Sequence, residues 1–343
     1  MVIAKTPFRI SFFGGGTDMP DFFCHHGGAV ISSTFDKYCY VNVRHLPRFF
    51  GYRNHISYSR IERVNSCDEI EHPAVREAMK FLDMDELIIS YDADLPARTG
   101  LGTSSSFMVG MLNAFYAMKG VYISRRRLAD EAIYVERNLC RETGGWQDQI
   151  AVTFGGLNRI DFSRDGYDIK PLVIDNKRKS RLNQNLMLFY TGISRNSANI
   201  QFETHKHMGR NIVYLQDMLK LVDEAERILV DKTAELDDFG RLMNITWRLK
   251  RQLSENISSA KIDELYNEAI KAGALGGKLL GAGGGGFLLI YAQQHKQEAV
   301  RQSLKGLLEV PFKFENHGTG IIYYDPEDGK YNEIVLKGGN LTS

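Results

Sequence analysis

A run of glycines near the end of the chain places the tightest limit on what the chain can fold into. Five of the six residues from Gly281 to Gly286 are glycine. Because each ordered glycine costs roughly 0.5–1 kcal/mol of chain entropy, a structural demand must offset the run. The run matches the pattern GxGxxG, but it precedes the apolar residues 287–291, which we predict to be a strand. A dinucleotide-binding loop follows a strand and opens a helix, so this context disfavours a dinucleotide site.

A second segment, rich in glycine, serine and threonine, stands about a third of the way along the chain and leads into an apolar pattern of helical period. Its residues are Gly100, Leu101, Gly102, Thr103, Ser104, Ser105 and Ser106. Such a loop at a helix N-terminus concentrates N–H donors and positive dipole, as a polyphosphate requires. The segment predicts a phosphate site, and the alternative is an ordinary loop with a serine N-cap.

A third glycine cluster lies near the start of the chain. We predict that residues 8–13 form a strand. Three glycines, at 14–16, follow this strand, and Asp18 ends the segment. Because glycine permits positive φ and close backbone approach, the turn can present Arg9 and Asp18 to a ligand. The alternative is a hairpin turn with no ligand.

An acidic pair follows the second of two predicted helices. Asp148 stands just after the glycine turn at 144–145, and Glu136 precedes that turn by less than one helix length. Asp148 can accept the proton of a substrate hydroxyl, and Glu136 can ligate a metal ion. Alternatively, Asp148 is a backbone cap of the kind common in turns.

Composition narrows the class of protein. With 343 residues the chain is long enough for two domains. Lys and Arg number 43 against 42 for Asp and Glu, so no overall charge favours nucleic acid or a membrane surface. We find no signal peptide and no stretch long enough to span a membrane. The four cysteines are scattered, without a CxxC pair, which favours reduced thiols and a cytoplasmic location.

The order of the predicted elements favours an α+β fold. Predicted strands, among them 29–33 and 39–44, dominate the first hundred residues. Two helices follow at 104–119 and 124–141, and long helical patterns fill the second half. The polar and basic stretch 175–185 marks the expected boundary. We therefore expect an N-terminal domain at 1–182 and a C-terminal domain at 183–343.

Taken together in this order, the three glycine-rich segments resemble the motifs of the GHMP kinases. The resemblance covers about residues 1–325 and implies two α+β domains with ATP held in the cleft between them. It implies that Asp148 is the catalytic aspartate and that Arg9 steadies it and the transferring phosphoryl group. Ser104 and Glu136 would hold Mg²⁺. The residues implied to contact the ATP phosphates are Gly100, Leu101, Gly102, Thr103, Ser104, Ser105, Ser106, Gly283 and Gly284.

Two departures from the family pattern stand out. Thr103 replaces the more usual serine, which keeps a hydroxyl at that position. The spacing from Glu136 to Asp148 is one residue longer than in mevalonate kinase, which leaves the metal ligand open.

The Gly-Gly-Gly-Thr-Asp18 form of the first motif, together with the segment Gly-Gly-Trp-Gln-Asp148-Gln, is most similar to the heptose-phosphate kinases and the related fucokinase domain. These enzymes phosphorylate the anomeric C1 hydroxyl of a sugar. The implied substrate is a heptose 7-phosphate. The implied substrate-binding residues are Gly15, Gly16, Thr17, Asp18 and Gly145. A cationic cluster should bind the substrate's own phosphate, and the candidates are Arg44, Arg48, Arg53 and Arg195.

Rival interpretations remain open at this point. A fucose or other hexose 1-kinase would share these motifs, and a kinase fold can also serve as a regulator that binds sugar and ATP without catalysis. A homodimer is left open. We expect no nucleic-acid or membrane partner.

Overall fold

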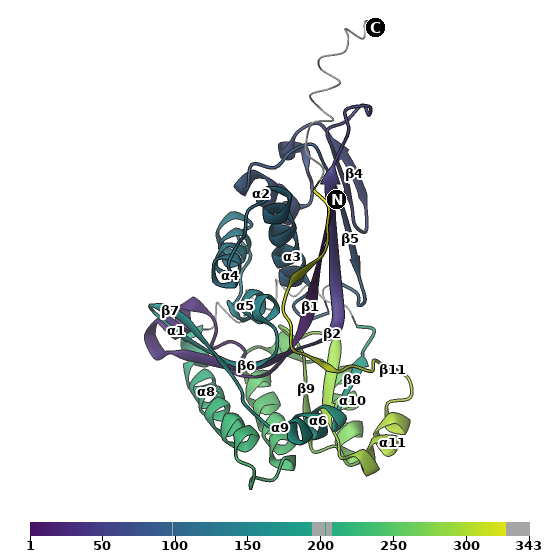
Figure 1. Cartoon of the computed structure of the whole chain (residues 1–343). Helices are drawn as coiled ribbons and strands as arrows, with labels where there is room; N and C mark the ends of the chain where they lie inside the picture. The colour runs from purple at the N-terminus through teal and green to yellow at the C-terminus, as the bar shows by residue number, and fades with distance from the viewer. Residues whose placement is uncertain (98, 194–202, 204–207, 327–343) are drawn as a thin grey trace, which may run out of the picture.

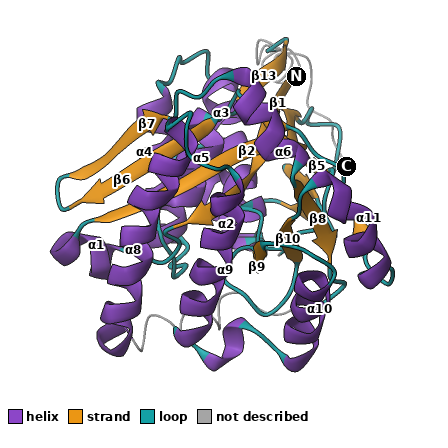
Figure 2. Cartoon of the chain, turned by 90° about the horizontal axis from the view of Figure 1, so that it is seen from below, coloured by secondary structure: helices purple, strands orange, loops and turns teal. Residues whose placement is uncertain are grey.

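The computed structural model describes residues 1–97, 99–193, 203 and 208–326. The strands of this part of the chain form a nine-stranded sheet and a four-stranded sheet. Helices pack against both, as Figure 1 and Figure 2 show from two directions. The α+β class predicted from the sequence is confirmed.

In Figure 1 the nine-stranded sheet extends from β4 and β5 at the upper right to β6 and β7 at the left. Its main path runs β13-β1-β2-β5-β3-β4, with β6 and β12 also pairing with β2 and β7 pairing with β6. The long strand β2 therefore changes partners along its length. The strands are β1 (Val2–Phe13), β2 (Gly28–His45), β3 (Asn54–Ser57), β4 (Ile61–Val64), β5 (Leu87–Ala93), β6 (Leu157–Ser163), β7 (Gly166–Pro171), β12 (Phe314–Glu315) and β13 (Gly320–Tyr324).

Helix α3 (Thr103–Met118) forms the centre of the N-terminal core. It is buried along nearly all of its length and packs against β1, β2 and three neighbouring helices, which explains why its sequence is apolar on almost every side. The other helical elements of this half are α1 (Pro20–His26), η1 (Cys67–Glu69), α2 (Pro73–Phe81), α4 (Arg125–Tyr134), η2 (Val135–Leu139) and α5 (Gln147–Phe154).

The four-stranded sheet has the order β11-β8-β10-β9, and its helices fill the lower part of Figure 1. Helix α9 packs on α8 and β9, and Trp247 of α9 is fully buried. The strands are β8 (Leu186–Tyr190), β9 (Gly276–Leu279), β10 (Phe287–Tyr291) and β11 (Leu308–Glu309). The helical elements are α6 (Asn176–Gln184), α8 (Met208–Val230), α9 (Asp237–Gln252), η3 (Glu255–Ile257), α10 (Ala260–Lys271) and α11 (Gln294–Ser303).

The end of the described chain returns to the first sheet. Strand β13 pairs antiparallel with β1, and β12 pairs with β2; the yellow trace beside the purple strands of Figure 1 follows this return. A division at 182/183 separates the sheets, but residues 314–324 do not belong with the C-terminal sheet. Sequence reasoning missed this because strand partners hundreds of residues apart leave no local pattern.

Three local predictions need correction. The two strands expected at 29–33 and 39–44 are one strand, β2. The expected boundary at 175–185 is helix α6, whose N-terminus is capped by the Asp175 side chain accepting from the Arg178 amide. The helix expected at 124–141 ends as the π-helical turn η2.

Two other expectations concern the surroundings of the protein. The four cysteines, Cys24, Cys39, Cys67 and Cys140, are free, as predicted. Within the described residues, no helix combines the length and the apolar character needed to cross a membrane.

Candidate active site

An ion pair between β1 and the first turn of α5 forms the centre of the candidate site. The Arg9 guanidinium donates from Nε to Asp148 Oδ1 at 2.7 Å and from Nη2 to Asp148 Oδ2 at 2.8 Å, a bidentate geometry that fixes both side chains. The Arg9 side chain is 5% exposed and that of Asp148 is 25% exposed. The guanidinium of the pair is therefore buried, whereas the Asp148 carboxylate remains partly exposed.

The same arginine contacts the glycine and serine segment. Arg9 Nη1 donates to the Gly100 carbonyl oxygen at 2.7 Å, and the Arg9 amide donates to the Leu101 carbonyl oxygen. A side chain on Gly102 would lie within 3.1 Å of the Arg9 Cγ atom. The structure thus brings together Arg9, Asp148 and this loop, three features that the sequence places far apart.

The loop opens helix α3 in the way a phosphate site requires. The N-cap is Gly102, with φ of 74°, and no side chain caps the helix. Main-chain N–H groups and the positive end of the helix dipole therefore face the loop, which is the arrangement that binds phosphate. The helix predicted at 104–119 is confirmed at 103–118.

The glycine-rich run near the C-terminus packs directly beneath this loop. A Cβ atom on Gly281 would lie 2.3 Å from Gly100 Cα, and one on Gly286 would lie 2.2 Å from the Thr99 carbonyl oxygen. Gly281, Gly283, Gly285 and Gly286 all have positive φ. Close approach of two backbones is the structural demand that offsets the entropy of the run. Of the two glycines expected to touch phosphate, Gly283 lies against the Ile257 backbone.

Glu136 lies behind the first turn of α3 and is 1% exposed. Its carboxylate accepts from Ser105 Oγ at 2.9 Å, from Ser104 Oγ at 3.3 Å, and from the Gln149 side-chain amide. Burial raises the pKa of Glu136. It stands in the π-helical turn η2, a local form often found at functional positions.

The surroundings of Glu136 fit a magnesium ion. Its three hydrogen-bond donors are neutral groups, so a cation would compensate the buried charge. No group of three or more His, Cys, Asp or Glu side chains able to hold a metal occurs among the described residues. A carboxylate, a serine hydroxyl and phosphate oxygens are a typical magnesium ligand set when a nucleotide is present.

Asp18 lies in the wall of the site and is 3% exposed. Its carboxylate accepts from the Gly16 amide and from the Gln147 amide, and burial raises its pKa. A Cβ on Gly145 would lie 1.8 Å from Asp18 Oδ2, so this position requires glycine. Asp18 thereby fixes the turn that carries Asp148.

The other residues of the first turn differ in accessibility. Thr17 is fully buried, with its hydroxyl within hydrogen-bond distance of the Gly14 and Ala29 carbonyl oxygens. It therefore shapes the turn rather than facing a ligand. Gly15 lies beside the side chains of Ser11 and Gln147. The Ser11 Oγ and Gln147 Oε1 atoms are buried and have no hydrogen-bond partner among the residues that the structure describes.

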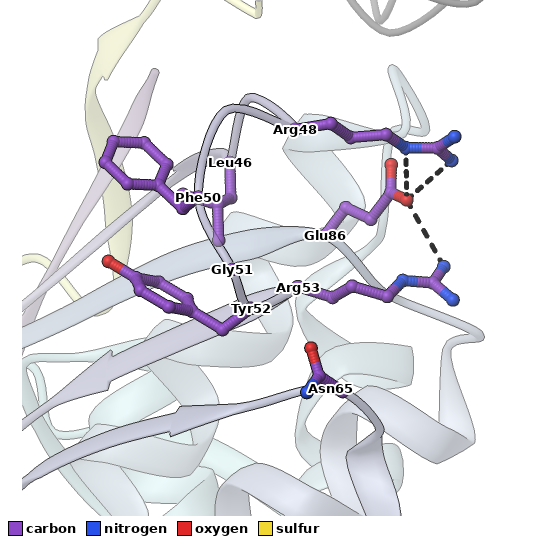
Figure 3. Close-up of a pocket in the computed structure, with 8 residues that line it drawn as sticks. All are labelled: Leu46, Arg48, Phe50, Gly51, Tyr52, Arg53, Asn65 and Glu86. Carbon is purple, nitrogen blue, oxygen red and sulfur yellow. Dashed lines mark hydrogen bonds and ion pairs between the residues drawn. The ribbon is translucent and has the colours of Figure 1, made fainter. Parts of the chain in front are cut away.

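Of the arginines proposed for the substrate phosphate, Arg44, Arg48 and Arg53 do not lie near this site. Arg9 pairs with Thr34 of β2, whereas Arg44 stands ten positions further along that strand, about 30 Å away at the rise of an extended strand. Arg48 and Arg53 line a separate pocket of about 330 Å³, where both contact Glu86, as Figure 3 shows. Arg195 lies outside the described residues.

Two buried lysines of the C-terminal half adjoin the site and were missed. Lys250 Nζ donates to the Leu279 and Gly281 carbonyl oxygens, and Lys278 Nζ donates to the Phe12 carbonyl oxygen at 3.0 Å. The available signal was the position of Lys250 on the buried stripe of α9, three residues after Trp247.

Comparisons with known proteins agree with this geometry. Residues 69–156 match the GHMP kinases N terminal domain, and residues 229–309 match the GHMP kinases C terminal domain. Over 317 residues the chain is 29% identical to a D-glycero-alpha-D-manno-heptose 7-phosphate kinase of Campylobacter jejuni, covering 88% of this chain and 92% of that protein. It is also 29% identical, over 343 residues, to a bifunctional fucokinase/GDP-fucose pyrophosphorylase of Arabidopsis thaliana, covering 91% of this chain but 32% of that longer protein.

Solved structures show the same fold. A D-glycero-D-manno-heptose 1-phosphate kinase from Bacteroides thetaiotaomicron superposes with a TM-score of 0.75 at 21% identity, covering 94% of this chain and 99% of that one. A Lactococcus lactis galactokinase complexed with galactose superposes with a TM-score of 0.70 at 16% identity, covering 93% and 94%. The two family domains match in order, and the two-domain fold is shared over nearly the whole chain, so this protein contains the N-terminal and the C-terminal domain of the GHMP kinases.

Proposed function

We propose that this protein is an ATP-dependent sugar kinase that phosphorylates the anomeric C1 hydroxyl of D-glycero-D-manno-heptose 7-phosphate, giving the 1,7-bisphosphate. The observation that carries the proposal is the bidentate Arg9–Asp148 pair joined to the loop at the N-terminus of α3. The heptose 7-phosphate kinase of Campylobacter jejuni, similar over nearly its whole length, supports the choice of substrate.

The proposed mechanism gives each residue one role. The loop from Gly100 to Ser106 holds the phosphates of ATP through main-chain amides. Asp148, oriented by Arg9, accepts the proton of the sugar hydroxyl as that hydroxyl attacks the γ-phosphate in line. Arg9 also offsets negative charge that develops during transfer. Because Arg9 is already fixed by the loop and by Asp148, this stabilisation needs no rearrangement.

We further propose that Ser104 and Glu136 hold the magnesium ion of the nucleotide. When bound, the ion would neutralise charge on the phosphate oxygens. The chain's own part is to hold the Glu136 carboxylate against the first turn of α3 through the hydroxyls of Ser104 and Ser105.

For the sugar, we propose contacts from Gly15, Gly16, Asp18 and Gly145. The partnerless polar atoms of Ser11 and Gln147 beside Gly15 support a hydrogen-bonding ligand there. We also propose two domains, residues 1–182 with the returning strands β12 and β13, and the remainder of the chain, and we place the protein in the cytoplasm.

A second candidate is a fucose or other hexose 1-kinase. The similarity to the fucokinase protein of Arabidopsis thaliana favours it, as does the distance of Arg44 and the pairing of Arg48 and Arg53 with Glu86, which leave no arginine cluster assigned to a substrate phosphate. A neutral sugar would need no such cluster.

A coupled assay of ATP consumption with Mg²⁺ tests these alternatives. Heptose 7-phosphate is compared with fucose, galactose and mannose, and phosphorus NMR identifies the product. A new anomeric phosphate on heptose 7-phosphate alone supports the proposal. Turnover of a neutral sugar keeps the kinase and removes the heptose assignment. Nucleotide binding without turnover of any sugar would favour a regulator.

A further inference from the structure

Helix α9 of the C-terminal half places a buried lysine close to the loop of residues 100–106, which we call the phosphate loop. Lys250 is 7% exposed. Its ammonium group donates to the carbonyl oxygens of Leu279 and Gly281, the two residues that flank Leu280. These are main-chain contacts at the point where β9 ends and the glycine-rich run begins.

That turn is the part of the C-terminal half closest to the loop. A Cβ on Gly100 would lie 2.4 Å from the Leu280 carbonyl oxygen and 3.0 Å from Gly281 Cα. Gly100 in turn accepts from Arg9. Lys250 therefore holds a backbone segment that packs directly against the phosphate loop.

The charge of Lys250 has no direct counterion among the described residues. Within the part of the chain that the structure describes, neither Lys250 nor the neighbouring buried Lys278 forms an ion pair; each donates to main-chain carbonyl oxygens. A buried ammonium without an anion is costly, and burial lowers the pKa of Lys250 to about 7. The charged groups that act on it are Arg9 of β1, Asp18 of the following turn, Asp148 of α5 and Lys278 of β9.

We infer that Lys250 is a positioning residue of the phosphate site: its ammonium group holds the glycine-rich turn against the phosphate loop and carries positive charge that the nucleotide phosphates balance from the other side of that loop. This inference rests on the proposed nucleotide site. It assigns to α9 a share in phosphate binding in addition to its packing on α8 and β9.

The inference predicts that nucleotide binding and protonation of Lys250 are linked. Lys250 is mostly charged below about pH 7 and mostly neutral above it. Anionic phosphate binds better when Lys250 is charged, so binding favours the protonated protein that dominates at lower pH. Binding at pH 8 should therefore draw a proton onto the protein. Affinity should fall about tenfold between pH 6.5 and pH 8.5, within the range allowed by one linked group.

The experiment titrates the wild-type protein with the magnesium complex of adenylyl imidodiphosphate, a nucleotide that is not hydrolysed. Calorimetry at pH 8 in two buffers of different protonation enthalpy measures proton uptake directly. Lys250→Met, which keeps the apolar stem, should lose the proton uptake and bind at least about tenfold more weakly at pH 6.5. Lys250→Arg, which stays charged, should retain affinity and lose the pH dependence.

The control is Lys271→Met, an exposed lysine of α10 paired with Glu268, which should behave as wild type. A wild-type protein that binds the nucleotide without proton uptake overturns the inference, as does a Lys250→Met protein with wild-type pH dependence and only a lower unfolding temperature. If Lys250→Met does not fold, proton uptake by the wild type and the behaviour of Lys250→Arg decide. Failure of the wild type to bind nucleotide at either pH would instead remove the proposed function.

Discussion

Arg9 of β1 connects Asp148 to the loop that precedes helix α3. Three of its five guanidinium N–H groups are already engaged, two with Asp148 and one with Gly100. Its remaining donors can serve a phosphoryl group without breaking these bonds. A lysine would offer neither the fork geometry nor this division of donors.

Replacing Asp148 by asparagine tests the proposed base most directly. Asp148→Asn keeps the size of the side chain but cannot accept the substrate proton, so kcat should fall by about 10³-fold or more. The Kd for nucleotide, measured by calorimetry, should stay within about threefold. Asp168→Asn, at a side chain that is 72% exposed, should leave both constants unchanged. Unchanged turnover in Asp148→Asn would remove the role.

Glu136 should affect stability and magnesium binding in opposite directions. Burial raises the pKa of Glu136 above its ordinary value of 4.5. At a pH between 4.5 and the raised pKa, Glu136 is ionised in the unfolded chain but still protonated in the folded protein. Without metal, the wild type therefore loses stability as the pH rises through the raised pKa. Glu136→Gln removes this loss and should melt higher than the wild type at pH 8 in EDTA, with a smaller difference at pH 5.

The same variant should need at least about tenfold more Mg²⁺ for half-maximal activity. Glu142→Gln, at a surface carboxylate 3.8 Å from Arg137, serves as the matched control for both measurements. A lower melting temperature at both pH values, together with an unchanged Mg²⁺ requirement, would contradict the assignment.

At the scale of elements, the contact between the phosphate loop and the glycine-rich run tolerates no side chain. Gly281→Ala would place a methyl group 2.3 Å from Gly100 Cα at a φ of +72°, so the two segments must separate. We expect a loss of about 2 kcal/mol or more in the free energy of unfolding and a KM for ATP raised severalfold. Gly306→Ala, where no atom lies within 4 Å, is the control, and urea titration with steady-state kinetics measures both. A Gly281→Ala protein as stable and active as this control would refute the tight contact.

The sequence predicts an element well when residues within that element determine its structure, and poorly when distant residues do. Helix α3 and its glycine entry are encoded within one segment, and the helix was found within one residue at each end. The sequence predicts a domain boundary where helix α6 lies, because this helix buries only Leu182 and no apolar stripe marks it. The role of Lys250 and the distance of Arg44 depend on tertiary packing, which no spacing in the sequence reveals.

At the scale of the whole molecule, the two halves share one hydrophobic core cluster. This cluster includes Phe8 and Phe12 of β1 together with Leu188 of β8 and Phe239 of α9. The rings of Phe12 and Phe239 pack edge-to-face, with 5.5 Å between their centroids. Packing of this kind couples the halves energetically. The division into two domains is therefore one of architecture more than of stability.

This coupling predicts a single cooperative unfolding transition. Each half contains one tryptophan, Trp146 in the N-terminal half and Trp247 in the C-terminal half, so the variants Trp146→Phe and Trp247→Phe each report on one half by fluorescence. Their urea transitions, each compared with circular dichroism of the same variant, should coincide between the two signals. Separate midpoints within one variant would show that the halves unfold independently.

The pairing of β13 with β1 also has a consequence for synthesis on the ribosome. The hydroxyls of Thr6 and Thr319 meet at 2.8 Å although 313 positions separate them. At about 5–20 residues added per second, the first strand waits roughly 15–60 s for its neighbour. During that interval β1, which carries Arg9, has an open edge to which another strand can pair. The nascent chain thus exposes the edge of β1 until β13 has been synthesised. We expect its yield to depend on chaperones more than its folded stability would suggest.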